Sequence, residues 1–196
     1  AKEFVGGAAI VAAHANSIGA HCHYLSVVGE DSNAQIVRQQ LDLHKVPHTL
    51  IPDESRPTTF KSRYMVENQK LFRVSRLQEH SLGEVIEDQV IQHLEELASE
   101  LDGILVSDFV YGVITDRILE TLQDLTKRYE LKLFGDLQCS SQIGNVAKFK
   151  NFHLLTPTEK EARVALGNRD DSVEWVASTL LEKTQSRNLV TKLGSK

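Results

Sequence analysis

One stretch of the sequence ends a buried strand on a carboxylate. Residues 101–106 form a short, mostly apolar run, which is typical of a strand covered on both faces. Ser107 and Asp108 then end the run with polar side chains, and Thr115 opens a helical pattern. Ligands bind just beyond the carboxyl ends of strands in open parallel sheets, so Asp108 is a candidate functional carboxylate. A turn residue that only caps nearby N–H groups explains the same pattern equally well.

Two further strand ends carry polar groups. Asp136 follows the strand pattern of residues 132–135, and Thr156, Pro157 and Thr158 stand at the end of that of residues 152–156. The carboxyl ends of parallel strands share one edge of a sheet, so we expect these side chains and Asp108 to lie near one another. A site that handles phosphate or sugar needs such a cluster, because carboxylates bind metals or hydroxyls.

A glycine pair, Gly6-Gly7, opens a helical pattern that Gly19 stops. Glycines at a helix start let a ligand approach the backbone N–H groups, and the helix dipole favours anions there. The pair is not the Gly-x-Gly-x-x-Gly fingerprint of dinucleotide-binding proteins. Tight packing of the helix on a sheet is the alternative explanation of these glycines.

Two extended runs, residues 58–66 and 70–75, surround the turn Glu67-Asn68-Gln69 and predict a hairpin. Basic residues, including Lys61, Arg63 and Arg73, interrupt its apolar alternation. A hairpin inserted into an alternating strand–helix chain is expected to act as a flap that closes over substrate. An edge hairpin with a solvated basic face remains the alternative.

The rest of the chain alternates strands and helices. Strands are expected at 23–28, 47–51, 101–106, 132–135, 152–156 and 188–191, and helices at 8–18, 34–43, 85–97, 115–128, 159–166 and 172–183. This order predicts a layered α/β fold with a mostly parallel central sheet, helices on both faces and a small β-hairpin lid. We expect residues 1–51 to form the first part of the core, 52–78 the lid, and 79–196 the second part of the core.

The composition of the chain disfavours nucleic-acid-binding and membrane-spanning proteins. The 196 residues carry a net charge of −5, which disfavours nucleic-acid binding, and no apolar run is long enough to span a membrane. Cys22 and Cys139 are isolated, so we expect a reducing, cytoplasmic location. The chain does not begin with Met and stops just after a strand pattern, so we expect both ends to have been cut from something longer.

Several different short motifs follow one another along the chain in a defined order. They are Gly6-Gly7-Ala8-Ala9 with Gly19 and Gly29; Arg56-Pro57-Thr58-Thr59 with Lys61 and Arg63; Asn68-Gln69 with Arg73; Ser107-Asp108-Phe109 with Gly112; Leu155-Thr156-Pro157 with Glu161; and Val190-Thr191 with Leu193-Gly194. In this order and spacing the sequence resembles the PfkB carbohydrate kinases, which have a ribokinase-like fold. Within them it is most similar to the heptose-phosphate kinase branch.

This resemblance implies transfer of the ATP γ-phosphate to a hydroxyl of a sugar or sugar phosphate, with Mg²⁺, in the cytoplasm. The residues it implies for substrate binding are Gly6, Gly7, Arg63, Asn68, Gln69, Arg73 and Asp108. Those it implies for the nucleotide are Thr158, Glu161, Thr191 and Gly194, with Glu161 organising Mg²⁺ and its waters. It also implies a homodimer formed through the hairpin lid.

The chain departs from the family pattern at three positions that bear on activity. Ile10 stands where the family has an Asn, Tyr111 where the heptose branch usually has Lys, and Thr158 where the Asn-x-x-Glu motif begins. The family's Gly-Ala-Gly-Asp segment, whose Asp is the catalytic base, does not occur in these residues. We therefore name no catalytic residue and expect this stretch alone to be inactive. A sugar- or nucleotide-binding module that kept the fold without the chemistry is the alternative function.

Overall fold

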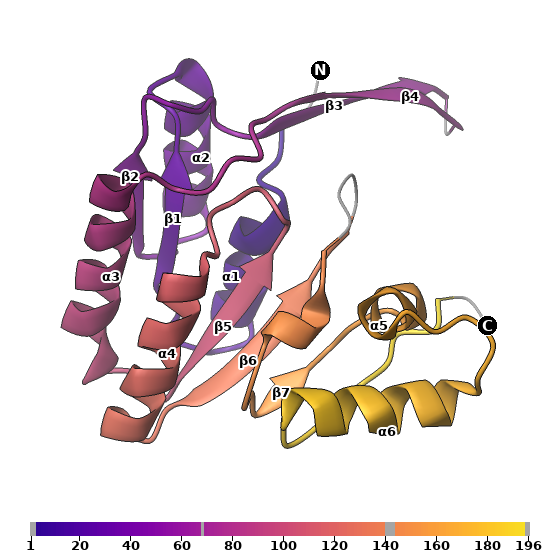
Figure 1. The fold of residues 1–196 in the computed structure, drawn as a ribbon. Coiled ribbons are helices and arrows are strands. Elements are labelled where there is room, and N and C mark those ends of the chain that lie inside the picture. Colours follow the sequence, from indigo (N-terminus) through magenta and orange to yellow (C-terminus); the bar gives the residue numbers. More distant parts are fainter. Residues whose placement is uncertain (1–2, 68, 140–143, 195–196) are drawn as a thin grey trace. The chain divides into compact units, whose positions relative to one another are not determined.

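The computed structural model describes residues 3–67, 69–139 and 144–194. The chain divides into two compact units, which we describe separately (Figure 1). The first unit comprises Ala1–Val90 with Tyr111–Val113, and the second comprises Ile91–Val110 with Ile114–Lys196.

In the first unit, helices and parallel strands alternate as expected. The elements are α1 (Gly7–Ser17), β1 (Tyr24–Val28), α2 (Ser32–Leu43) and β2 (His48–Pro52). Strands β1 and β2 pair in parallel, with Tyr24 opposite His48. The N-cap of α2 is Asp31, whose carboxylate accepts from the Ala34 N–H at 3.1 Å. The core of this unit consists of Val5, Ala9, Ala12, Ala13, Leu41 and Val46.

The predicted hairpin is confirmed and also belongs to the first unit. Strands β3 (Phe60–Val66) and β4 (Gln69–Arg76) pair antiparallel, with a bulge between Tyr64 and Met65. Every described residue of β4 is exposed. Figure 1 shows the two strands as an arm that projects from the other elements of the first unit.

Helix α3 (Glu84–Ala98) leads from the first unit into the second, where three parallel strands form one sheet. The strands are β5 (Gly103–Asp108), β6 (Lys132–Leu137) and β7 (Leu154–Leu155), in that order across the sheet. Helix α4 (Asp116–Tyr129) joins β5 to β6 and buries Ile118, Leu119, Leu122 and Leu125. The short helix η1 (Val146–Lys148) contacts both α5 (Glu159–Leu166) and α6 (Val173–Thr184), and these two helices also pack on each other.

The prediction of a strand at residues 188–191 is wrong. In that region Leu189 and Lys192 make isolated parallel bridges to Leu155 and Thr158, and no continuous ladder forms. Pro157 lies between the two bridges and has no N–H to donate, which interrupts the ladder. Strand β7 is correspondingly shorter than the expected residues 152–156.

In the part of the chain that the structure describes, no helix is long and apolar enough to cross a membrane.

Candidate active site

At the end of β5, Asp108 forms an ion pair in the second unit. The carboxylate is buried, with 3% of the side chain exposed, and its Oδ2 lies 2.6 Å from Lys148 Nζ. Its Oδ1 accepts from the Val110 N–H at 2.7 Å. Lys148 lies on η1 and also donates to the carbonyl of Ile114 at 3.3 Å. Asp108 is therefore both a turn cap and the buried half of an ion pair, whose lysine is 28% exposed.

Asp136, near the end of β6, is the centre of a second polar cluster. Its Oδ1 accepts from Lys192 Nζ at 2.6 Å and from Thr156 Oγ1 at 3.0 Å, and its Oδ2 accepts from Gln138 Nε2 at 2.8 Å. Burial alone would raise the pKa of this carboxyl, but these hydrogen bonds and the charge of Lys192 hold the pKa below its ordinary value. Asp136 is consequently ionised near neutral pH.

The register places both clusters at the same edge of the sheet, as expected. Ser107 lies opposite Asp136, and Asp108 lies opposite Leu137. Because side chains alternate along a strand, the carboxylates of Asp108 and Asp136 point to opposite faces of the sheet. The strand ends therefore meet, but each carboxylate has its own lysine partner on its own face.

The start of α5 brings the predicted nucleotide residues together. Thr158 is the N-cap and Glu161 completes a capping box, with Thr158 Oγ1 accepting from Glu161 N at 3.2 Å and Glu161 Oε2 accepting from Thr158 N at 2.8 Å. Glu161 Oε1 also accepts from Cys139 N at 3.0 Å. The bridge between Thr158 and Lys192 brings Thr191 alongside, and the buried Thr191 Oγ1 has no hydrogen-bond partner among the described residues. Gly194, with φ +73°, follows two residues later.

Two of these residues, Glu161 and Thr191, have groups that could contact a magnesium–nucleotide complex. Glu161 is 7% exposed, and each of its oxygens accepts one backbone N–H, which leaves lone pairs for water. Among the described residues, no group of three or more His, Cys, Asp or Glu side chains could hold a metal ion. Mg²⁺ commonly binds through one or two carboxylates, waters and substrate phosphates rather than a protein cage. The hydroxyl of Thr191, which has no hydrogen-bond partner among the described residues, could donate a hydrogen bond to a phosphate oxygen.

The glycine pair lies at the start of α1 in the first unit. Gly6 is the N-cap, and no described protein atom outside its chain neighbours lies within 4 Å of where a Cβ would stand. Gly7 has φ +56°, a left-handed conformation that glycine adopts readily. The structure thus leaves open space beside Gly6, as the ligand interpretation of this pair requires.

The hairpin carries one basic face. Lys61 and Arg63 alternate along β3, and the register sets Arg63 directly opposite Arg73 on β4, so the three cations share a face. We call Lys61, Arg63 and Arg73 the basic face. Gln69 lies opposite Val66 at the tip, and Asn68 falls outside the described residues.

Of the predicted site residues, Thr158, Glu161 and Thr191 come together in the second unit, which also contains Gly194 and Asp108. Gly6, Gly7, Arg63, Gln69 and Arg73 belong to the first unit. Sequence reasoning missed the roles of Lys148 and Lys192. Nothing in the sequence near Lys148 indicates its role, because its partner Asp108 is 40 positions away. Lys192, by contrast, directly follows Thr191 within a motif that had already been recognised.

Solved structures share this fold. Phosphofructokinase-2 from Escherichia coli, solved in complex with fructose-6-phosphate, matches with a TM-score of 0.73 at 16% identity, over 96% of this chain and 62% of its own. Ribokinase from Giardia lamblia matches with a TM-score of 0.68 at 14% identity, over 89% of this chain and 54% of its own. The fold is therefore the α/β ribokinase-like fold, as the sequence predicts.

The chain belongs to the pfkB family of carbohydrate kinases, because the family profile matches residues 1–196. Among curated relatives, the bifunctional protein HldE of Geobacter sulfurreducens is 30% identical over 190 residues, which cover 95% of this chain and 38% of that protein. The HldE of Helicobacter hepaticus is 31% identical over 164 residues, or 83% of this chain and 33% of that protein. The chain thus spans between one third and two fifths of the length of these relatives.

Proposed function

We propose that the chain is an ATP-dependent carbohydrate kinase whose acceptor is a sugar monophosphate, with a heptose phosphate favoured. Membership of the pfkB family supports the carbohydrate kinase class. The resemblance to the heptose-phosphate kinase branch supports a heptose phosphate as the acceptor. The single observation that supports a phosphorylated acceptor is the basic face of the hairpin.

Like charges directly opposite each other across two strands destabilise a hairpin. Arg63 and Arg73 are such a pair. A bound dianion would accept charge-assisted hydrogen bonds from both guanidinium groups and offset the like charges. The basic face is therefore suited to the phosphate of a sugar that the hairpin covers.

The nucleotide would lie at the start of α5. Magnesium-bound ATP supplies the phosphoryl group and the charge neutralisation that its transfer needs. Thr158 and Glu161 would hold the metal's water shell, and the Thr191 hydroxyl and the left-handed turn at Gly194 would border the phosphates. Gly6 and Gly7 would bring backbone close to the sugar, and Asp108 is a separate candidate for substrate binding in the second unit.

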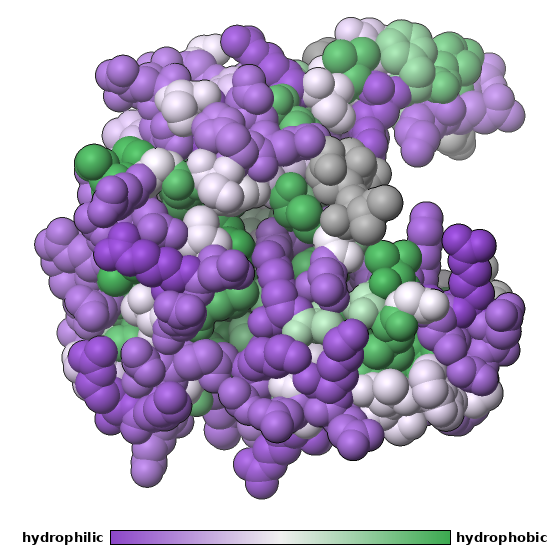
Figure 2. Space-filling model, in the orientation of Figure 1, coloured by the Kyte–Doolittle hydropathy of each residue, from purple (hydrophilic) through white to green (hydrophobic). Residues whose placement is uncertain are grey.

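The hairpin would also form a homodimer. Its second face is apolar, since Phe60, Tyr64 and Phe72 are between 38% and 53% exposed and Tyr64 stacks on Phe72 with ring centroids 4.4 Å apart. Figure 2 shows apolar side chains gathered over the hairpin. An exposed apolar patch of this kind marks an interaction surface, and a second copy of the hairpin would cover it.

The test is substrate discrimination by the natural full-length protein, because we propose that residues 1–196 alone are inactive. ADP release would be measured with Mg²⁺–ATP and sedoheptulose 7-phosphate, mannose 6-phosphate or fructose 6-phosphate, alongside unphosphorylated mannose and fructose. Each charge-assisted hydrogen bond contributes about 1.5–3 kcal/mol. We therefore expect R63M and R73M each to lower kcat/KM for the preferred sugar phosphate by roughly 10–100-fold, with KM for ATP nearly unchanged.

R38M is the matched control, because Arg38 is an exposed arginine that belongs to α2 and not to the hairpin strands. It should behave as the wild type. Equal turnover of phosphorylated and neutral sugars, or an equal effect of R63M on both classes, would show that the basic face does not read phosphate.

A further inference from the structure

Arg56 is a buried arginine whose guanidinium nitrogens donate to three different segments of the first unit. With 7% of the residue exposed, it donates from Nε to Asp53 Oδ2 at 2.7 Å, from Nη1 to the Tyr111 carbonyl at 3.0 Å, and from Nη2 to the His80 carbonyl at 2.9 Å. Asp53 is 4% exposed, and its Oδ1 accepts from the backbone and hydroxyl of Ser55. Burial opposes ionisation of Asp53, but the Ser55 and Arg56 hydrogen bonds hold its pKa below the ordinary value.

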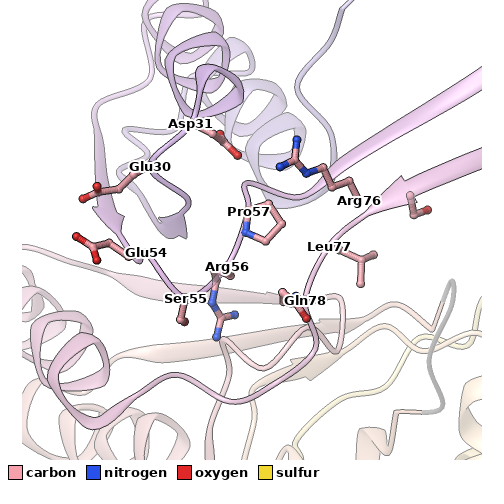
Figure 3. A pocket seen from close by; sticks show the side chains of 10 residues that line it. Glu30, Asp31, Glu54, Ser55, Arg56, Pro57, Arg76, Leu77 and Gln78 are labelled. Carbon is pink, nitrogen blue, oxygen red and sulfur yellow. The ribbon is translucent and has the colours of Figure 1, made fainter.

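Arg56 joins the two segments that flank the hairpin strands, and we call these two segments the roots of the hairpin. Arg56 lies just before β3, and His80 lies just after β4. Strands β3 and β4 are paired up to Phe60 and Arg76, and beyond these residues the two roots diverge around an open hollow of about 650 Å³. Figure 3 shows this hollow, with Ser55, Arg56 and Pro57 along one root and Arg76, Leu77 and Gln78 along the other.

Contacts to His80 link the two roots across their divergence. The first is the bond from Arg56 Nη2 to the His80 carbonyl, and the second is a hydrogen bond of 2.9 Å between Ser55 Oγ and His80 Nε2. The same segment is locked against residues 111–113, since Leu82 N donates to the Gly112 carbonyl at 3.1 Å. A Cβ at Gly112 would lie 2.0 Å from the His80 oxygen, so the two backbones are in close contact.

Arg56 also holds Tyr111, whose ring contacts Lys61 of the basic face. It holds the carbonyl of Tyr111, which is 7% exposed, and Lys61 Nζ lies 5.1 Å from the centroid of the Tyr111 ring. A cation–π contact of this kind orients the lysine only if the ring itself is held in place. The arginine that fastens the roots therefore also sets the position of the first cation of the basic face.

We propose that Arg56 is a positioning residue that holds the hairpin roots and Tyr111 in one arrangement, so that the basic face meets the anionic group of the substrate in a fixed orientation. This inference rests on the proposed function. Each of the guanidinium nitrogens already has a protein acceptor, so Arg56 acts through the hairpin and makes no contact with the substrate. A planar, forked guanidinium can join three oxygens in this way, whereas a lysine ammonium on a flexible stem cannot reproduce the geometry.

The test uses R56K in the full-length chain, because this variant keeps the charge and loses the fork. With the sugar phosphate that the wild type turns over best, we expect KM for the sugar phosphate to rise about tenfold or more, and KM for ATP to change less than about twofold. Hydrogen exchange should quicken at the amides of residues 60–67 and 69–76, because the roots are no longer held. The control R38Q should change neither quantity.

S55A provides a milder variant if R56K does not fold. It removes one link to His80 and the hydroxyl's hydrogen bond to Asp53, but keeps the hydrogen bonds of Arg56 to Asp53 and His80, so exchange in the hairpin should rise by a smaller amount. Unchanged hairpin exchange in both variants would overturn the proposal. A uniform loss of kcat and of affinity for both substrates in a folded R56K would overturn it as well, by showing a merely structural role. Exchange also separates the two proposals, since a wild type that phosphorylates no sugar would contradict the proposed function while R56K still reports on the roots.

Discussion

Two ion pairs, Asp108–Lys148 and Asp136–Lys192, hold the polar ends of β5 and β6. The aspartates could be recognised in the sequence because each follows an apolar strand pattern. Their lysine partners could not, because they come from distant segments that only the fold brings to the sheet edge. The alternative interpretation of Asp108 as a turn cap is confirmed by its bond from Val110 N, and the ion pair adds a second role that the same carboxylate performs.

Removing Lys148 should leave a buried carboxylate without its counter-charge. We expect K148M to lower the free energy of unfolding by roughly 3 kcal/mol, since breaking one side of a buried pair strands the other charge. The double variant K148M/D108N should recover most of this loss, because the stranded charge is then gone. Urea denaturation of the three proteins measures both effects.

K150M serves as the control for this series. Lys150 is an exposed neighbour that donates to the Lys183 carbonyl at 2.7 Å, so its loss should cost less than about 1 kcal/mol. If K148M were as stable as the wild type, or if the double variant were no better than K148M, the pair would not be energetically coupled.

At the scale of elements, the hairpin combines two different surfaces on one pair of strands. We propose that the basic face binds an anionic substrate and that the apolar face, where Tyr64 stacks on Phe72, contacts a second copy of the chain. Antiparallel register makes this division possible, because residues opposite each other on the two strands always share a face. The strands were predictable from the turn and the extended runs, whereas the opposition of Arg63 and Arg73 depends on the register.

A charge placed on the apolar face should therefore separate the dimer. We expect the wild type to be a dimer at tens of micromolar and F72E to be monomeric, because burying a carboxylate in an apolar contact is strongly unfavourable. Sedimentation equilibrium measures the masses. L43E is the matched control, since Leu43 is a 72% exposed apolar residue at the end of α2. A monomeric wild type, or a dimeric F72E, would refute the hairpin interface.

At the scale of the whole molecule, the fold class and most elements could be predicted from the sequence because strands and helices alternate with clear periodicity. The predicted strand at 188–191 failed because Pro157 interrupts the ladder that its apolar residues suggested. The capping box of Thr158 and Glu161 follows from their three-residue spacing. The Arg56 network does not, because its acceptors at Tyr111 and His80 are backbone carbonyls, which leave no signature in residue type.

The most direct measurement is phosphorus NMR of the full-length chain incubated with ATP, Mg²⁺ and the panel of sugars and sugar phosphates. The proposed function predicts a new phosphomonoester signal from one sugar phosphate, with ADP formed in equal amount. Calorimetric binding of ATP and a sugar phosphate, with no transfer between them, would contradict the kinase proposal. That result would instead favour a binding module that kept the fold without the chemistry.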